Sequence, residues 1–347
     1  MDRTAPTEEP HVFVLADGPL PPSERRMISG TAFLVAFVAA IVLTPFVRQV
    51  AHNVGLLDPP GRRKVHQVAV PRLGGLAIAA SFYLGMAVAL VLARAVFGRR
   101  YGIEVGPLPA ILAGVALIAG LGMLDDLQNL RARVKLTAQI FIVMATFGLG
   151  LSIDRLDGPW GSLRLEAWAL PVTMLWMVAV INAVNLIDGL DGLAAGVALI
   201  GFAAFMAVAL LQGSSSPIQP VLAAAAGGVF GFLRFNLPPS SIHMGDSGSM
   251  VLGFILAAAA IMLTQIGRPG VPPWVPLLIL ALPLADTVRV AVTRLLAGYP
   301  IFRPDRRHLH HRLLRLGISH QGATLLLWAV SALLAGVGVV LAAMALR

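Results

Sequence analysis

Five aspartates near the ends of apolar segments are the residues of this chain best suited to chemistry. A carboxylate close to lipid is costly to keep, so such a residue is read as functional by default. Proteins hold magnesium through one or two carboxylates together with substrate phosphates. The pattern therefore predicts a site that binds a divalent cation and handles phosphates, built from Asp125, Asp126, Asp188, Asp191 and Asp246.

The adjacent pair Asp125 and Asp126 closes an apolar segment in GMLDDLQNL. Two neighbouring carboxylates repel each other, and a nearby cation relieves the repulsion. The alternative is a pair of solvated end charges, but negative charge is unfavourable at a helix C-terminus. This placement favours a functional pair, and we expect the following basic residues, Lys135 among them, to bind anions that the metal does not.

Four polar residues in NAVNLIDGLDGL are spaced by three, namely Asn182, Asn185, Asp188 and Asp191. Residues three apart are neighbours on a helix, so the two asparagines share one helix end and the aspartates continue into a glycine-broken turn. Their oxygens suit a hard cation such as magnesium. The alternative is interhelical hydrogen bonding by the asparagines, which is strongest as an explanation for Asn182.

The segment GDSGS precedes another apolar stretch, and Asp246 or Ser247 is a natural N-cap there. A helix N-terminus also attracts phosphate through its free amides, so capping and ligand binding are compatible. Asn236 and the two prolines that follow it shape the approach to this segment.

The segment HLHH supplies hydrogen-bond donors suited to a diphosphate (His308, His310 and His311). Zinc is the alternative, but no upstream residues have the spacing of a zinc motif. Asp286 is predicted to orient a basic partner such as Arg289 or Arg294, with a simple buried ion pair as the alternative. Only two of the 26 basic residues are lysines, Lys64 and Lys135, and both lie in polar loops. One explanation is that lysine is kept there as a compact positive charge that binds phosphate, and chance is the alternative explanation.

The elements that position these residues are membrane helices. The chain is 57% hydrophobic and 12% charged, against roughly 45–50% and about 25% in soluble domains. Stretches long enough to span a bilayer recur along it, so we predict an all-α, polytopic integral membrane protein of about 10–11 transmembrane helices. The predicted spans are 28–50, 74–97, 107–123, 134–152, 168–187, 192–212, 218–235, 248–266, 274–296 and 322–345.

Two regions are expected, a polar tail over residues 1–26 and one transmembrane domain over 27–347. The polar residues of that domain that could do chemistry lie in loops on one side, at 55–75, 124–135, 185–192, 235–249 and 298–320. These loops carry most of the Lys and Arg residues, so the positive-inside rule places them in the cytoplasm and both termini outside. The net charge of +9 is thereby explained by orientation and anionic lipid rather than by nucleic acid.

Four motifs in this order resemble the polyprenyl-phosphate N-acetylhexosamine-1-phosphate transferases, the glycosyltransferase 4 family. The motifs are LDDLQNLRARVKL, NAVNLIDGLDGL, FNLPPSSIHMGDSGS and HLHHRLLRLGISH, and the resemblance runs from Gly55 to His320. It is nearest to the WecA- and TagO-like enzymes of the N-acetylglucosamine branch. It is more distant from MraY, which has three consecutive histidines where this chain has His-Leu-His-His.

The resemblance implies a magnesium-dependent enzyme, with manganese as a substitute, at the cytoplasmic face of the inner (plasma) membrane. It would move a sugar 1-phosphate from UDP-GlcNAc to undecaprenyl phosphate and release UMP, the first membrane step of envelope polysaccharide synthesis. A homodimer fits the family. By motif, four of the five aspartates and the three histidines are implied to be catalytic, namely Asp125, Asp126, Asp188, Asp191, His308, His310 and His311. Substrate binding is implied for Lys64, Lys135, Asn182, Asn236 and Arg307, and metal binding for Asn185 and Asp246.

Two other functions stay open from the sequence. One is an MraY-like transfer of phospho-MurNAc-pentapeptide. The other is an ion-coupled transporter, which predicts charged groups near the bilayer midplane and inverted repeats. The acids here cluster at one interface and no repeat is visible. Direct attack by the lipid phosphate and a two-step route through an aspartyl phosphate are both compatible with these residues.

Overall fold

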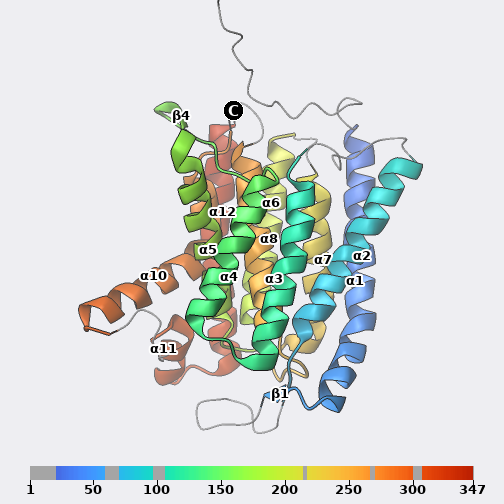
Figure 1. Ribbon diagram of the computed structural model, residues 1–347, viewed down its shortest axis with the longest axis vertical. Helices are drawn as coiled ribbons and strands as arrows, with labels where there is room; N and C mark the ends of the chain where they lie inside the picture. Colours follow the sequence, from blue (N-terminus) through green and yellow to red (C-terminus); the bar gives the residue numbers. More distant parts are fainter. Residues whose placement is uncertain are drawn as a thin grey trace, which may run out of the picture.

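The computed structural model describes residues 21–58, 70–96, 106–213, 217–265, 270–299 and 307–346. Figure 1 shows long helices standing side by side, which confirms the all-α prediction. The helices are α1 (Pro22–Asn53), α2 (Gly74–Ala95), α3 (Leu108–Gln128), α4 (Ala132–Gly148), α5 (Ala169–Ile187), α6 (Leu193–Leu211), α7 (Ile218–Asn236), α8 (Gly245–Gln265), α9 (Trp274–Ile279), α10 (Ala281–Leu296), α11 (Leu309–Arg315) and α12 (His320–Ala345).

Within the described residues, eight helices are long and apolar enough to cross a membrane. They are α1, α2, α3, α5 together with the short 3-10 helix η1 (Glu166–Trp168), α6, α7, α8 and α12. The protein is therefore a multi-pass membrane protein. Helix α4 has 17 residues and carries Arg133 and Lys135 in its first turns.

The predicted continuous span 274–296 is wrong, because the chain breaks at Leu280 between α9 and α10. Pro283 has no N–H to donate to the carbonyl of Ile279, which removes one helical hydrogen bond at this point and favours a break. Figure 1 shows α10 pointing away from the other helices. Helix α1 also begins earlier than predicted, at Pro22, so the last residues of the predicted polar tail are helical; proline is well suited to a first helical turn.

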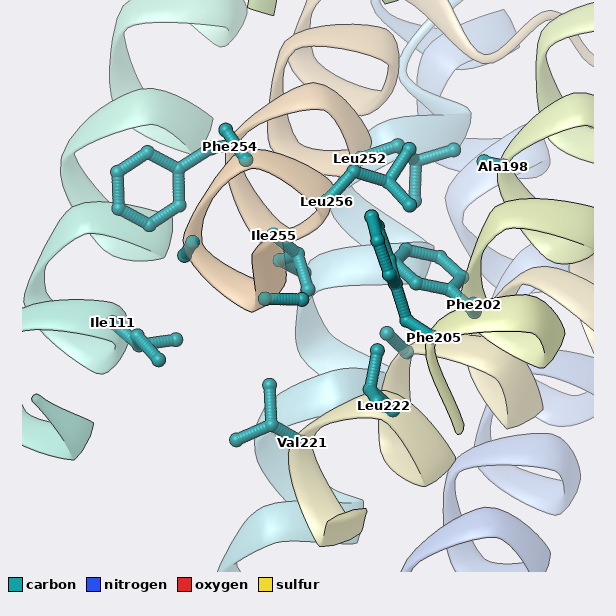
Figure 2. Packing of buried hydrophobic residues seen from close by; sticks show 14 of the residues in the cluster. Ile111, Ala198, Phe202, Phe205, Val221, Leu222, Leu252, Phe254, Ile255 and Leu256 are labelled. Carbon is teal, nitrogen blue, oxygen red and sulfur yellow. The ribbon is translucent and has the colours of Figure 1, made fainter. Parts of the chain in front are cut away.

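Helix α8 is the centre of the bundle. All of its most apolar 18-residue stretch is buried, and the helix contacts α2, α3, α5, α6 and α7. Figure 2 shows Phe254 turned toward α3, while Leu252 and Leu256 lie near Phe202 and Phe205 of α6. A run of four alanines, residues 257–260, continues the helix. Small side chains let membrane helices approach closely, which favours association by packing.

Glycines allow α2 and α3 to touch the first turn of α8. A Cβ added at Gly75 would lie 2.0 Å from the backbone nitrogen of Gly248, and one added at Gly122 would lie 2.3 Å from the Cα of Ser247. The start of α8 is thus wedged between two helices at a distance that only glycine permits.

Short strands mark the two ends of the bundle. Near the start of α8, β1 (Leu57–Asp58) pairs with β2 (Val70–Pro71), and the following backbone bonds to the chain before α8, with Gly75 N–H donating to Met244 O at 2.8 Å. At the opposite end, β3 (Arg155–Gly158) and β4 (Gly161–Arg164) form a hairpin. In Figure 1 the start of α1 and the end of α12 also lie at that opposite end, as the predicted topology requires.

Replacing Gly122 by alanine is expected to destabilise the protein by about 1–3 kcal/mol, the usual cost of overpacking a tight core. The matched control is Gly120→Ala on the same helix, where an added Cβ meets nothing within 4 Å. Thermal unfolding in detergent, followed by intrinsic fluorescence, measures both. Equal melting temperatures for the two variants would contradict the close approach of α3 and α8.

Candidate active site

Asp246, in the first turn of α8, joins groups from three other helices. Its Oδ1 accepts a hydrogen bond from Asn185 Nδ2 of α5, and Lys135 Nζ of α4 lies 3.5 Å from its Oδ2. The same ammonium is ion-paired with Asp125 Oδ2 of α3. The Asp246 side chain is 33% exposed whereas that of Asp125 is 3% exposed. Asp246 is therefore the carboxylate of this cluster that an incoming ligand can reach.

Asp126 has a different position from Asp125. Its two carboxylate oxygens accept the backbone N–H groups of Asp246 at 2.8 Å and Ser247 at 3.0 Å. It therefore caps the N-terminus of α8 from another helix, in place of the local cap that the sequence suggested. Gly245 has a φ of +72°, and a Cβ there would lie 2.6 Å from Asp126 Oδ2. Both oxygens of Asp126 are thus used to hold α8, while its neighbour Asp125 faces Lys135.

The two asparagines of α5 also separate. Asn185 donates to Asp246 and, at 2.8 Å, to Ser249 Oγ. Asn182, one turn deeper, donates to Gln139 Oε1 of α4 at 2.6 Å. Asn182 thus makes an interhelical hydrogen bond, which was the alternative to ligand binding for this residue. Asn185, in contrast, lies in the Asp246 cluster.

The turn after α5 is tied to the loop before α8. Asp191 accepts the N–H of Ser240 at 3.0 Å, and its other oxygen lies 3.6 Å from His243 Nε2. Asn236 is buried and bridges the same two segments, accepting from Gly192 N–H and donating to Ile242 O. The buried Asn236 side chain therefore holds these two loop segments together.

The histidine segment meets this turn. His310 is buried, and a Cβ added at Gly189 would lie 2.3 Å from its Nε2, so the ring packs directly on the DGLDG turn. Its ring stacks with that of His308 at 5.9 Å and lies 4.2 Å from that of His311. Residues far apart in the sequence are thus brought together, as predicted.

Arg307 lies at the edge of this segment. Its guanidinium donates to Thr293 O at 3.2 Å and lies 5.4 Å from the ring centre of Tyr299. The predicted residue Lys64 lies outside the described residues.

Burial changes the pKa of two side chains outside the membrane-spanning helices, Asp188 after α5 and His310 in α11. It raises the pKa of Asp188 to about 7, an effect opposed by His243 and increased by the Asp246, Asp126 and Asp191 carboxylates. Burial also lowers the pKa of His310 to about 3, helped by the neighbouring His311 and His308. His310 is therefore neutral at physiological pH and can serve a ligand through hydrogen bonding and packing, not through charge.

The residues present fit a magnesium ion only if the substrate supplies part of its coordination. Among the described residues, no group of three or more His, Asp and Glu side chains is arranged to hold a metal. Asp246 offers a carboxylate oxygen, and Asn185, whose Nδ2 donates to Asp246 in this structure, would add its amide oxygen. Magnesium is commonly held by one or two carboxylates plus substrate phosphates.

Sequence reasoning missed three polar residues of the site. His243 pairs with Asp191, Ser249 accepts a hydrogen bond from Asn185, and Gln139 accepts one from Asn182. The spacing of three between Asp246 and Ser249 is a signal that could have found the serine. Nothing in the sequence alone pairs Gln139 with Asn182 across two helices.

Comparison with known proteins gives the family. Residues 108–264 match Glycosyl transferase family 4. A probable undecaprenyl-phosphate N-acetylglucosaminyl 1-phosphate transferase of Bacillus subtilis (strain 168) is 35% identical over 309 residues, which is 88% of this chain and 83% of the relative. The chain belongs to this family. Its helices α3 to α8 coincide with the matched region and hold most of the site.

Two further relatives have similar coverage. A decaprenyl-phosphate N-acetylglucosaminephosphotransferase of Mycobacterium tuberculosis (strain ATCC 25618 / H37Rv) is 34% identical over 89% of this chain and 80% of its own length. An undecaprenyl-phosphate alpha-N-acetylglucosaminyl 1-phosphate transferase of Salmonella typhimurium is 31% identical over 90% of this chain and 84% of its own length. The similarity to these relatives thus extends over most of the chain, as the sequence motifs implied.

Asp188→Asn is expected to stabilise the protein at pH 8, in the absence of divalent cations, by on the order of 2 kcal/mol. The folded-state pKa of about 7 lies well above the usual pKa of an aspartate, about 3.8, so wild-type stability falls as the pH rises through this window. Below about pH 4 both forms are neutral and the difference should vanish. Thermal unfolding at pH 4 and pH 8 measures this, with Asp154→Asn at an exposed position as the control. A gain that is the same at both pH values would contradict it.

Proposed function

We propose that this protein transfers N-acetylglucosamine 1-phosphate from UDP-GlcNAc to a polyprenyl phosphate, undecaprenyl phosphate being the expected acceptor, and releases UMP. The names of its relatives support the reaction. The observation that carries the proposal is the accessible Asp246 carboxylate, joined to Asp125, Lys135 and Asn185 at one end of a membrane bundle. An acceptor lipid would place its long apolar chain along the membrane helices and its phosphate at this polar end of the bundle.

The chemistry follows from the charges of the substrates. An oxygen of the lipid phosphate attacks the β-phosphorus, the new P–O bond forms, and the bond from that phosphorus to the bridging oxygen breaks as UMP leaves. A phosphate monoester has a second pKa of about 6, so the attacking group is largely deprotonated at neutral pH. Both reactants are anions, and the main task of the protein is to align them and offset their charge.

The residues divide this task. Asp246 and Asn185 would hold Mg²⁺, which when bound offsets the negative charge of the diphosphate and of the departing UMP. Lys135 contributes a fixed positive charge beside them. Asp125, not Asp126, is assigned to the lipid-phosphate side because it acts through Lys135: its Oδ1 accepts the N–H of Leu130 and its Oδ2 is ion-paired with the Lys135 ammonium. Both oxygens of Asp126 instead hold the amides of α8. The histidine segment closes the sugar-diphosphate side of the site.

We assign the site to the cytoplasmic face of the plasma membrane, on the evidence of the basic loops at this end. There the reaction would be the first membrane step of an envelope polysaccharide. The rival functions fit less well. A transporter needs charged residues at midplane depth, whereas these aspartates lie at helix ends. An MraY-like enzyme would use the same chemistry on UDP-MurNAc-pentapeptide, and only a substrate test separates the two.

Purified protein with undecaprenyl phosphate, Mg²⁺ and UDP-GlcNAc is expected to release UMP, and far less with UDP-MurNAc-pentapeptide. Asp246→Asn should lower the rate by about 100-fold or more, as expected for loss of a group that stabilises transition-state charge. The control is Asp154→Asn, an exposed carboxylate at the opposite end, which should keep wild-type activity. Release only from the pentapeptide substrate, or full activity of Asp246→Asn, would contradict the proposal.

A further inference from the structure

Asp286 of α10 is a buried carboxylate on which several groups of the histidine segment converge. Its side chain is 2% exposed. Its Oδ2 lies 2.9 Å from His308 Nδ1, and its Oδ1 accepts the backbone N–H of Leu309 at 3.0 Å. Arg289 Nη2 donates to the same Oδ1 at 2.7 Å and also to the carbonyl oxygen of Arg307. The predicted basic partner Arg289 is therefore present, but it is only one of three groups that contact Asp286, with the His308 ring and the N–H of Leu309.

These contacts lock α10 to the start of α11. Helix α11 has no side-chain cap from its own N-cap residue, His308. Asp286 supplies an acceptor for the N–H of Leu309 from another helix, and Arg289 holds the carbonyl of Arg307 one residue before His308. A buried carboxylate must be paired and hydrogen-bonded to be tolerated, and here the partners are the backbone and the imidazole that begin the HLHH segment.

The same carboxylate sets the state of the His308 ring. A carboxylate only accepts, so Nδ1 must carry the proton in this contact, and Nε2 is left for a ligand. The ring stacks on His310 with an interplanar angle of 9°, and His310 packs on Gly189 of the DGLDG turn. A continuous path of contacts thus runs from Asp286 through two histidines to the turn beside Asp188.

We propose that Asp286 is a positioning residue, which fixes the tautomer and orientation of His308 and thereby the seating of the histidine segment against the 188–192 turn. This inference rests on the proposed function, since it assigns His308 to the sugar-diphosphate side of that site. Asp286 itself does not contact the reacting atoms. Its loss should therefore act through His308 and leave the acceptor lipid unaffected.

A double-mutant cycle tests this. Asp286→Asn is expected to lower kcat/KM for UDP-GlcNAc by about 10–100-fold, in the range found when a partner that orients a functional histidine is lost, with KM for undecaprenyl phosphate unchanged. The variant carrying both Asp286→Asn and His308→Gln should be no slower than His308→Gln alone.

The matched control is Asp157→Asn, which removes a carboxylate bound to Arg155 and to the N–H of Gly270 at the other end of the molecule and should leave kcat/KM unchanged. Losses that multiply in the double variant would overturn the proposal.

A second readout is independent of turnover. Nitrogen-15 NMR of protein labelled at histidine, with the His308 signal assigned from His308→Gln, should show the Nδ1-protonated ring in the wild type and a changed tautomer ratio in Asp286→Asn. Unchanged His308 nitrogen shifts would overturn the proposal whether or not the enzyme turns over. If the wild type releases no UMP, the proposed function fails, and the shifts still decide the role of Asp286.

Discussion

The two hydrogen bonds from the first amides of α8 to Asp126 are the interaction on which the site depends. Helix α8 is the most buried element of the bundle, so its N-terminal amides have little access to water and require a protein acceptor. Asp126 provides both acceptors, and Gly75, Gly122 and Gly245 leave the room for this approach. Because Asp246 is the residue after Gly245, the same contact that closes the core sets the position of the most accessible carboxylate.

Charge explains why this end of the bundle is suited to anionic substrates although it is rich in aspartates. Lys135 lies between Asp125 and Asp246 and offsets part of their repulsion. Asp188 keeps a raised pKa because it is buried among other carboxylates. In the proposed function, a divalent cation and a diphosphate bind here together, and the site supplies few metal ligands and a separate histidine segment on the substrate side.

The sequence predicts the helices and the gathering of the motifs well, because hydropathy and helix periodicity are local signals. It does not predict the break at Leu280, since Pro276 and Pro283 do not interrupt the apolar run. The spacing of three places Asn182 and Asn185 on one face, but their different depths decide that only Asn185 reaches Asp246. The division between Asp125 and Asp126, and the contact of His310 with Gly189, depend on which helices meet, and no local pattern encodes that.

In the proposed function, Asp246 and Asn185 hold a divalent cation at the start of α8. The most direct test is electron paramagnetic resonance of Mn²⁺ titrated into purified protein with UDP, in the wild type and in Asp246→Asn. We predict one bound Mn²⁺ per chain in the wild type and at least tenfold weaker binding in the variant, the size of effect expected when a charged oxygen ligand is lost. Equal Mn²⁺ binding by the two proteins would contradict the claim and place the metal elsewhere.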